Sequence, residues 1–151
     1  MKRVLAVLVV LSAVVFGFAI GAQAAPARGV RIYIPFAFQA GDQLMPAGEY
    51  LFEFPGVGNF ASGSLLKIAT QDGSACQHLL SRAIPGGTKD TDWHVTFNKY
   101  GDLYFLTKIR NSDLGAEVSK TREENQLAAE YMHALKPVAA VELKAIHTKA
   151  K

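Results

Sequence analysis

The stretch from Trp93 to Ile109, WHVTFNKYGDLYFLTKI, constrains the fold more than any other part of the chain, because its alternation and its turn residues agree. Asn98 suits the first position of a type I turn, and Gly101 suits the left-handed position that closes a three-residue loop. The pattern therefore predicts a β-hairpin whose connection is residues 99–101.

This loop length also predicts the register of the hairpin, with Val95 opposite Phe105 and Phe97 opposite Leu103. One face is then predominantly apolar and carries Trp93, Val95, Phe97, Leu103, Phe105, Thr107 and Ile109. The other face carries a mixed set that can meet solvent or line a semi-polar cavity, namely His94, Thr96, Tyr104, Leu106 and Lys108.

Alternation of apolar and polar residues predicts further strands before this hairpin. They cover residues 30–39, 50–54, 65–70 and 75–81, and an Asp-Gly turn joins the last two. Pro35 cannot donate to a strand ladder, so the first strand lies at an edge, is bulged, or has an offset partner there. The polar composition of residues 83–92 predicts a loop, and residues 111–115 are expected to end the second strand of the hairpin.

A capping box of Thr121 and Glu124 predicts one helix over about residues 122–135. Four residues recur at helical spacing and are expected to lie against the sheet: Leu127, Ala128, Tyr131 and Leu135. Residues 138–146 are compatible with a strand or a helical turn, and the strand is favoured; residues 147–151 form a basic tail. These elements predict an all-β domain of about six to eight antiparallel strands, barrel or sandwich, with one C-terminal α-helix.

The first 24 residues have the pattern of a signal peptide. A positive Lys2-Arg3 pair precedes an apolar run over residues 4–20, and Ala22 and Ala24 give the small-x-small pattern that predicts cleavage after Ala24. The alternative is an uncleaved anchor, but 17 apolar residues reach about 26 Å as a helix, less than the roughly 30 Å hydrocarbon core. The expected product is a single domain, residues 25–151, in the periplasm or outside the cell.

Cleavage changes the charge balance of the chain. Two of the 16 Lys and Arg residues are removed, and 14 remain against 13 Asp and Glu, a net charge of +1. Nucleic-acid binding needs a concentrated basic surface, so neither a nucleic-acid partner nor, after cleavage, a membrane partner is expected.

Metal and cofactor signals are weak. The single cysteine, Cys76, excludes an internal disulfide and is expected to be a small buried hydrophobic residue. Cys76 and His78 share a strand face but supply at most half of a zinc site. Gly56 and Gly58 lack the third glycine and the helix of a dinucleotide-binding loop, so they predict a flexible connection. No metal or cofactor is assigned.

One group of residues resembles an acid-base cluster: Asp90, Asp92 and His94 alternate into the start of the hairpin. No serine lies in a Gly-x-Ser-x-Gly elbow, and carboxylates in a polar loop are ordinarily solvated. We therefore expect a non-enzymatic binding or surface-associated module and assign no catalytic residue. The alternative is a small periplasmic hydrolase that uses these three residues.

Three motifs carry a resemblance to other proteins. Pro35-Phe36-x-Phe38, Leu44-Met45-Pro46-Ala47-Gly48-Glu49-Tyr50 and Phe97-x-x-Tyr100-Gly101-Asp102-x-Tyr104-Phe105-Leu106 resemble those of a group of small secreted bacterial proteins of unassigned function. The resemblance implies a single exported domain and transfers no catalytic or binding residue. The expected partner is a small apolar ligand in the interior of the domain, or a protein or glycan at its loops.

Overall fold

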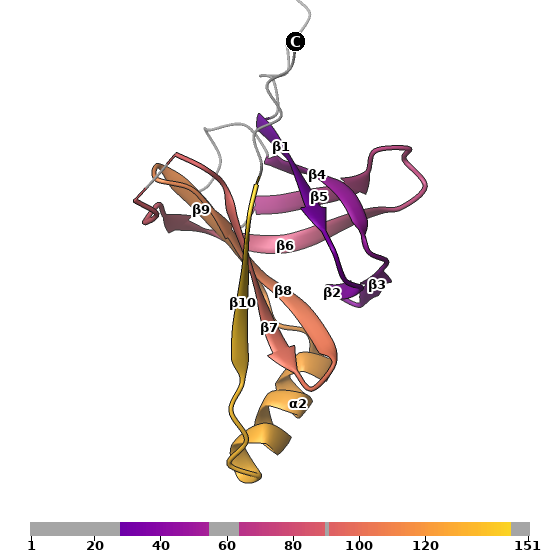
Figure 1. Cartoon of the computed structure of the whole chain (residues 1–151), viewed down its shortest axis with the longest axis vertical. Coiled ribbons are helices and arrows are strands. Elements are labelled where there is room, and N and C mark those ends of the chain that lie inside the picture. Colours follow the sequence, from indigo (N-terminus) through magenta and orange to yellow (C-terminus); the bar gives the residue numbers. More distant parts are fainter. Residues whose placement is uncertain (1–27, 55–63, 90, 146–151) are drawn as a thin grey trace, which may run out of the picture.

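The computed structural model describes residues 28–54, 64–89 and 91–145. Within them, ten strands form one sheet and a single α-helix packs beside it (Figure 1). The strands are β1 (Arg28–Ile34), β2 (Phe38–Ala40), β3 (Gln43–Met45), β4 (Gly48–Phe54), β5 (Ser64–Thr70), β6 (Cys76–Pro85), β7 (His94–Tyr100), β8 (Leu103–Arg110), β9 (Leu114–Val118) and β10 (Ala139–Lys144). The helix is α2 (Arg122–His133).

The predicted signal peptide and basic tail lie outside the described residues, as does the glycine-rich connection at residues 55–63. No helix in the described part of the chain is long and apolar enough to cross a membrane.

The all-β class with one C-terminal helix is confirmed, although the described strands number ten instead of six to eight. The order is β1-β4-β5-β6-β9-β8-β2-β3, and β7 and then β10 continue from the other edge of β8. Within the described chain, β1 pairs only with β4 and β10 pairs only with β7, so β1 and β10 do not pair with each other. The sheet is therefore sandwich-like and not a closed barrel, with β1, β4, β5 and β6 in one half and β7, β8 and β10 in the other (Figure 1).

Several strand boundaries differ from the predicted ones. The predicted strand over residues 30–39 breaks after Ile34 into β1 and β2, because Pro35 cannot continue the ladder and β1 is an edge strand. The predicted polar loop is shorter, since β6 continues to Pro85, and the predicted break at 111–115 hides β9. Both differences have one cause, because Ile84 and Pro85 pair with β9, a partner that local sequence does not show. The favoured strand after the helix is confirmed as β10.

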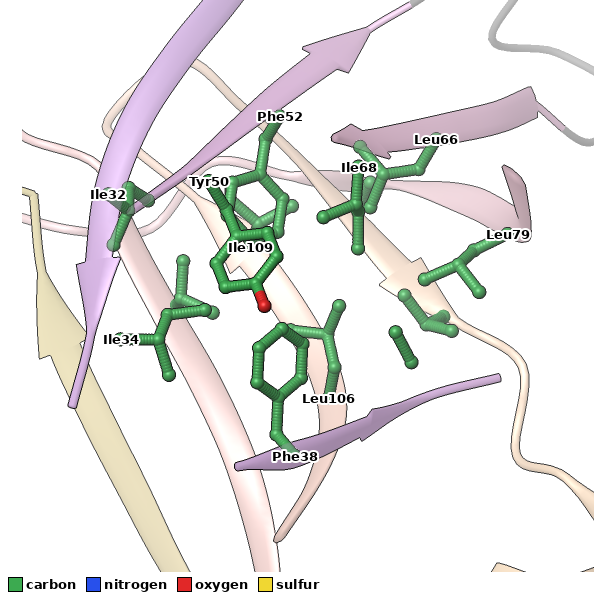
Figure 2. Packing of buried hydrophobic residues seen from close by; sticks show 14 of the residues in the cluster. Ile32, Ile34, Phe38, Tyr50, Phe52, Leu66, Ile68, Leu79, Leu106 and Ile109 are labelled. Carbon is green, nitrogen blue, oxygen red and sulfur yellow. The ribbon is translucent and has the colours of Figure 1, made fainter. Parts of the chain in front are cut away.

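Aromatic and aliphatic side chains fill the space between the two halves of the sheet (Figure 2). Phe38 packs edge to face on Tyr50 and on Phe97, with ring centroids 5.2 and 5.4 Å apart, and all three side chains are fully buried. The Tyr50 hydroxyl donates to the carbonyl oxygen of Pro46, so its polar end is satisfied inside the core. Trp93, just before β7, stacks on Phe54 of β4 with ring centroids 4.7 Å apart and packs against this core.

The central hairpin is present, but its loop is one residue shorter than predicted. Tyr100 pairs with Leu103, so the loop is Gly101-Asp102. Gly101 has a φ of 62°, the left-handed value that a type II′ turn requires at its first loop residue. The role assigned to Gly101 is confirmed, while the three-residue loop is wrong.

The shorter loop moves the pairing of Phe97 by three positions, from Leu103 to Leu106. An odd shift reverses the two faces of a strand. Leu106 consequently lies in the core, on the face opposite to the predicted one. Phe105 faces away from that core and packs edge to face on Tyr100.

A β-bulge at Thr107 then restores the predicted faces. Thr107 has no partner on β7, because Phe97 pairs with Leu106 and Thr96 with Lys108. Beyond the bulge, Val95 and the Ile109 of β8 are fully buried on one face, as predicted, but they pair with each other, so the predicted pairing of Val95 with Phe105 is wrong.

The helix begins where the capping box predicts. The Thr121 hydroxyl accepts from the backbone N–H of Glu124 at 3.1 Å. The carboxylate of Glu124 is buried and accepts from the amide of Asn98 at 2.8 Å and the hydroxyl of Tyr100 at 3.5 Å. This side chain therefore anchors the start of α2 to β7. Leu135 was expected against the sheet, but it lies beyond the last turn of α2 and is 92% exposed.

Candidate functional site

A row of polar side chains crosses four neighbouring strands on the face of the sheet that points away from the core. Arg82 on β6 pairs with Glu117 on β9, and Glu117 also pairs with Lys108 on β8. Lys108 in turn lies opposite Thr96 on β7. Directly opposite residues on one face of a sheet are close enough to interact. The Arg82 guanidinium contacts one carboxylate oxygen of Glu117, with Nε at 2.6 Å, and the Lys108 ammonium lies 3.5 Å from the other.

This row forms part of the lining of a pocket of about 450 Å³. The segment of residues 118–120, which leads from β9 to α2, and Ala140 on β10 also line it. Asn98, Thr107, Ser119 and Lys120 bring further polar side chains to the same space. The volume lies within the range of small-molecule sites, and most of the described lining residues are of polar or charged types, whereas a typical ligand pocket is lined predominantly by apolar ones.

Among the described lining residues of this pocket, cations outnumber carboxylates. Arg82, Lys108 and Lys120 line it together with one described acidic residue, Glu117. Burial opposes ionisation of Glu117, but the hydrogen bonds and charges of Arg82 and Lys108 outweigh it, so the pKa of Glu117 lies below its ordinary value. Lys120 has no ion-pair partner within 4.0 Å among the residues that the structure describes, so its charge is available to a ligand.

A buried hydroxyl lies among the lining residues. Thr96 Oγ1 is shielded from solvent and has no hydrogen-bond partner in the described chain. Its neighbour Thr107 donates its own hydroxyl to the backbone carbonyl of Thr96 at 2.9 Å, a contact made at the bulge. An unpartnered buried hydroxyl costs about 1–3 kcal/mol, and bulges often re-aim side chains at functional sites.

Of the candidate acid-base cluster, Asp92 and His94 lie in the described chain, whereas Asp90 lies outside the described residues. The Asp92 carboxylate is 2.7 Å from the ammonium of Lys144, and the His94 imidazole is 2.6 Å from the carboxylate of Glu142, so each pairs with a residue of β10. Glu142 also lies 3.9 Å from Arg110. These contacts form a network of ion pairs that joins β10 to β7 and β8.

Cys76 and His78 lie on the outer face of β6, and the prediction that Cys76 is buried is wrong, because its side chain is exposed. His78 lines a second hollow of about 320 Å³, which shares residues 118–120 with the polar pocket. In the described ranges, no three His, Cys, Asp or Glu residues are grouped so that they could hold a metal.

The sequence indicated part of the polar pocket and missed the rest. Thr96 and Lys108 were predicted on a mixed face able to line a semi-polar cavity, and both line this pocket. Arg82 was missed because it falls at the end of an expected strand, and Glu117 because β9 was not expected. The one local signal was the alternation of Ala116, Glu117 and Val118.

Comparisons with protein-family models, with curated proteins and with solved structures find no match for this chain. The resemblance to small secreted bacterial proteins therefore stays a prediction.

Proposed function

We propose that the chain is an exported, non-enzymatic binding domain whose ligand occupies the polar pocket between β6, β7, β8, β9 and β10. The observation that supports the proposal is the excess of positive charge in the pocket, whose described lining holds the cations Arg82, Lys108 and Lys120 and one carboxylate, Glu117. A bound polar ligand would use the charge of Lys120, which has no ion-pair partner in the described chain.

The filled core favours this polar site over the apolar ligand expected from the sequence. The side chains between the two halves of the sheet are close-packed, and Tyr50, Phe38 and Phe97 are fully buried there. An apolar ligand would have to displace these side chains, whereas a polar ligand finds an open pocket on the other face.

Native mass spectrometry of protein purified from its own host tests the proposal. A retained small molecule is expected, and the variant Lys120→Gln should lose most of it while its unfolding midpoint stays near that of the wild type, because Lys120 is exposed. A ligand retained equally by Lys120→Gln would place the site elsewhere. Repeated purification without any bound small molecule would count against a ligand-binding role.

A hydrolase is the second candidate, and one contact favours it. The His94 imidazole lies 2.6 Å from the Glu142 carboxylate, and a carboxylate that orients a histidine is part of many general-base arrangements. Esterase, glycosidase and peptidase panels test this candidate. We expect no activity; activity lost in both His94→Ala and Glu142→Gln, with the fold intact, would make the hydrolase the better interpretation.

A further inference from the structure

We infer that the ligand of this pocket is a small, hydroxyl-rich molecule that carries one oxyanion group, either a carboxylate or a phosphate. The inference rests on the proposed function, because it names the chemical class of the ligand for the same site. It follows from the charge of the lining, from the hydroxyl and amide groups there, and from the size of the pocket.

Charge gives the anionic part of the inference. The Arg82 and Lys108 cations share the single Glu117 carboxylate, while Lys120 has no carboxylate partner among the described residues. The described lining therefore has three cations and one anion, a positive excess that a bound oxyanion would neutralise. Charge-assisted hydrogen bonds from lysine and arginine are among the strongest that a protein makes to carboxylates and phosphates.

The remaining lining residues give the hydroxyl-rich part. Asn98 and Ser119 bring a carboxamide and a hydroxyl to the pocket. The amide of Asn98 donates to Glu124, which leaves its carbonyl oxygen as an acceptor. None of the described lining residues is aromatic, so recognition by them relies on hydrogen bonds and charge. The volume of about 450 Å³ has room for a molecule the size of a single sugar.

Glu117 competes with the ligand for the same cations. Its carboxylate accepts from Arg82 and approaches Lys108, which are the contacts that an incoming oxyanion would seek. Removing the negative charge of Glu117 should therefore strengthen the binding of an anion. A ligand without charge would gain nothing from this change.

Three probes of similar size separate the possibilities: glucuronate, glucose 6-phosphate and glucose. Binding is followed by the backbone amide shifts of the ¹⁵N-labelled domain, residues 25–151, at low and at high salt. We expect one or both anions at millimolar concentration to shift the amides of residues 118–120 and of Thr96, and glucose to have no effect. Binding should weaken as salt rises, because screening weakens the attraction between the anion and the cations.

Four variants connect the shifts to this pocket. Lys120→Gln should weaken the binding of the anion about tenfold, while Lys136→Gln, which makes the same charge change at the far end of α2, should leave it unchanged. Glu117→Gln should strengthen binding several-fold, while Glu53→Gln, on β4 and paired with Lys67, should not.

Ser119 tests the hydroxyl separately from the charge. Ser119→Ala should weaken binding, and Ser119→Thr, which keeps a hydroxyl, should retain it. Should Ser119→Ala fail to fold, the Lys120 and Glu117 pairs of variants still decide the question.

Glucose that binds as tightly as glucuronate, or shifts that ignore both Lys120→Gln and Glu117→Gln, would overturn the inference. An absence of shifts with both anions would do the same. In each case native mass spectrometry of the protein from its own host still tests the proposed function independently. A neutral ligand retained in the pocket would support the binding role while contradicting the inference that the ligand carries an oxyanion.

Discussion

Gly86 offers the sharpest test of how the two strands that carry Arg82 and Glu117 are held together. Gly86 follows the end of β6, and a Cβ atom added there would lie 2.1 Å from the backbone oxygen of Ser112 and 2.6 Å from the backbone nitrogen of Asp113. The obstacle is backbone and cannot rotate away. We therefore expect Gly86→Ala to force the end of β6 away from the turn between β8 and β9.

The cost can be worked out from the contacts of that turn. The side-chain oxygen of Asn111 accepts from the backbone N–H groups of Asp113 and Leu114, at 3.0 and 2.9 Å, so the turn resists movement. The backbone N–H of Gly87 donates to the carbonyl of Asn111 at 3.1 Å, and this bond is lost if the two segments separate. Overpacking costs about 1–3 kcal/mol and a hydrogen bond about 0.5–1.5 kcal/mol. Gly86→Ala should thus lower the free energy of unfolding by about 2–4 kcal/mol.

The neighbouring glycine supplies the matched control. At Gly87 an added Cβ has Arg110 Nη1 as its nearest neighbour, at 3.8 Å, an ordinary contact. Gly87→Ala should change the free energy of unfolding by no more than about 0.5 kcal/mol. Urea unfolding of both variants gives the comparison, with the slope against urea checked for constancy. Equal midpoints would refute the close approach of β6 to the β8–β9 turn and weaken the register that places Arg82 opposite Glu117.

Three further predictions concern the hairpin, the pocket and export. Gly101→Val should lower the urea midpoint more than Gly101→Asn, because a φ of 62° strains a β-branched residue by roughly 1–2 kcal/mol. The new Cβ would also lie 3.1 Å from the Tyr131 hydroxyl. Equal midpoints for the two variants would contradict the turn. Glu117→Gln should destabilise the fold at neutral pH, because the pKa of Glu117 is lower in the folded than in the unfolded state and its ionised form therefore stabilises the fold. This stabilisation is lost as pH falls through the folded-state pKa, so the difference in stability from wild type should shrink near pH 4 and below. A difference independent of pH would count against the ion pairs. The intact mass of the exported protein should begin at Ala25, and Met1 retained on membrane-bound protein would show that the leader is not cleaved.

Local features of the fold could be predicted from the sequence because their causes are local. The Asp-Gly turn between β5 and β6 and the start of α2 at Thr121 each depend on residues within a few positions of one another. The left-handed φ of Gly101 is another such case. Alternation likewise placed Tyr50, Phe52 and Phe54 on one buried face of β4.

Pairings between distant segments could not be predicted in this way. Gln39 pairs with Phe105 in a parallel contact, and β9 pairs with both β6 and β8. In each case the sequence of one segment does not indicate which segment is its partner. The hairpin register failed for a related reason. Both a three-residue and a two-residue loop can use Gly101, and the choice between them depends on whether Leu106 or Phe105 fits the core.

The polar pocket could not be predicted from the sequence either, because its lining depends on several of these pairings between distant strands. Its lining residues Arg82, Glu117, Lys108 and Thr96 are fixed by the sheet ladder, with β9 as the strand that aligns the first three. Part of the wall, residues 118–120, leads directly into α2, and α2 is anchored to β7 by the buried carboxylate of Glu124. The strand residues therefore determine the arrangement of charges on the sheet, and the anchoring of α2 determines the position of Lys120 relative to those charges. A single buried hydrogen-bonded group thus links the capping of the helix to the charge that the proposed anion would meet.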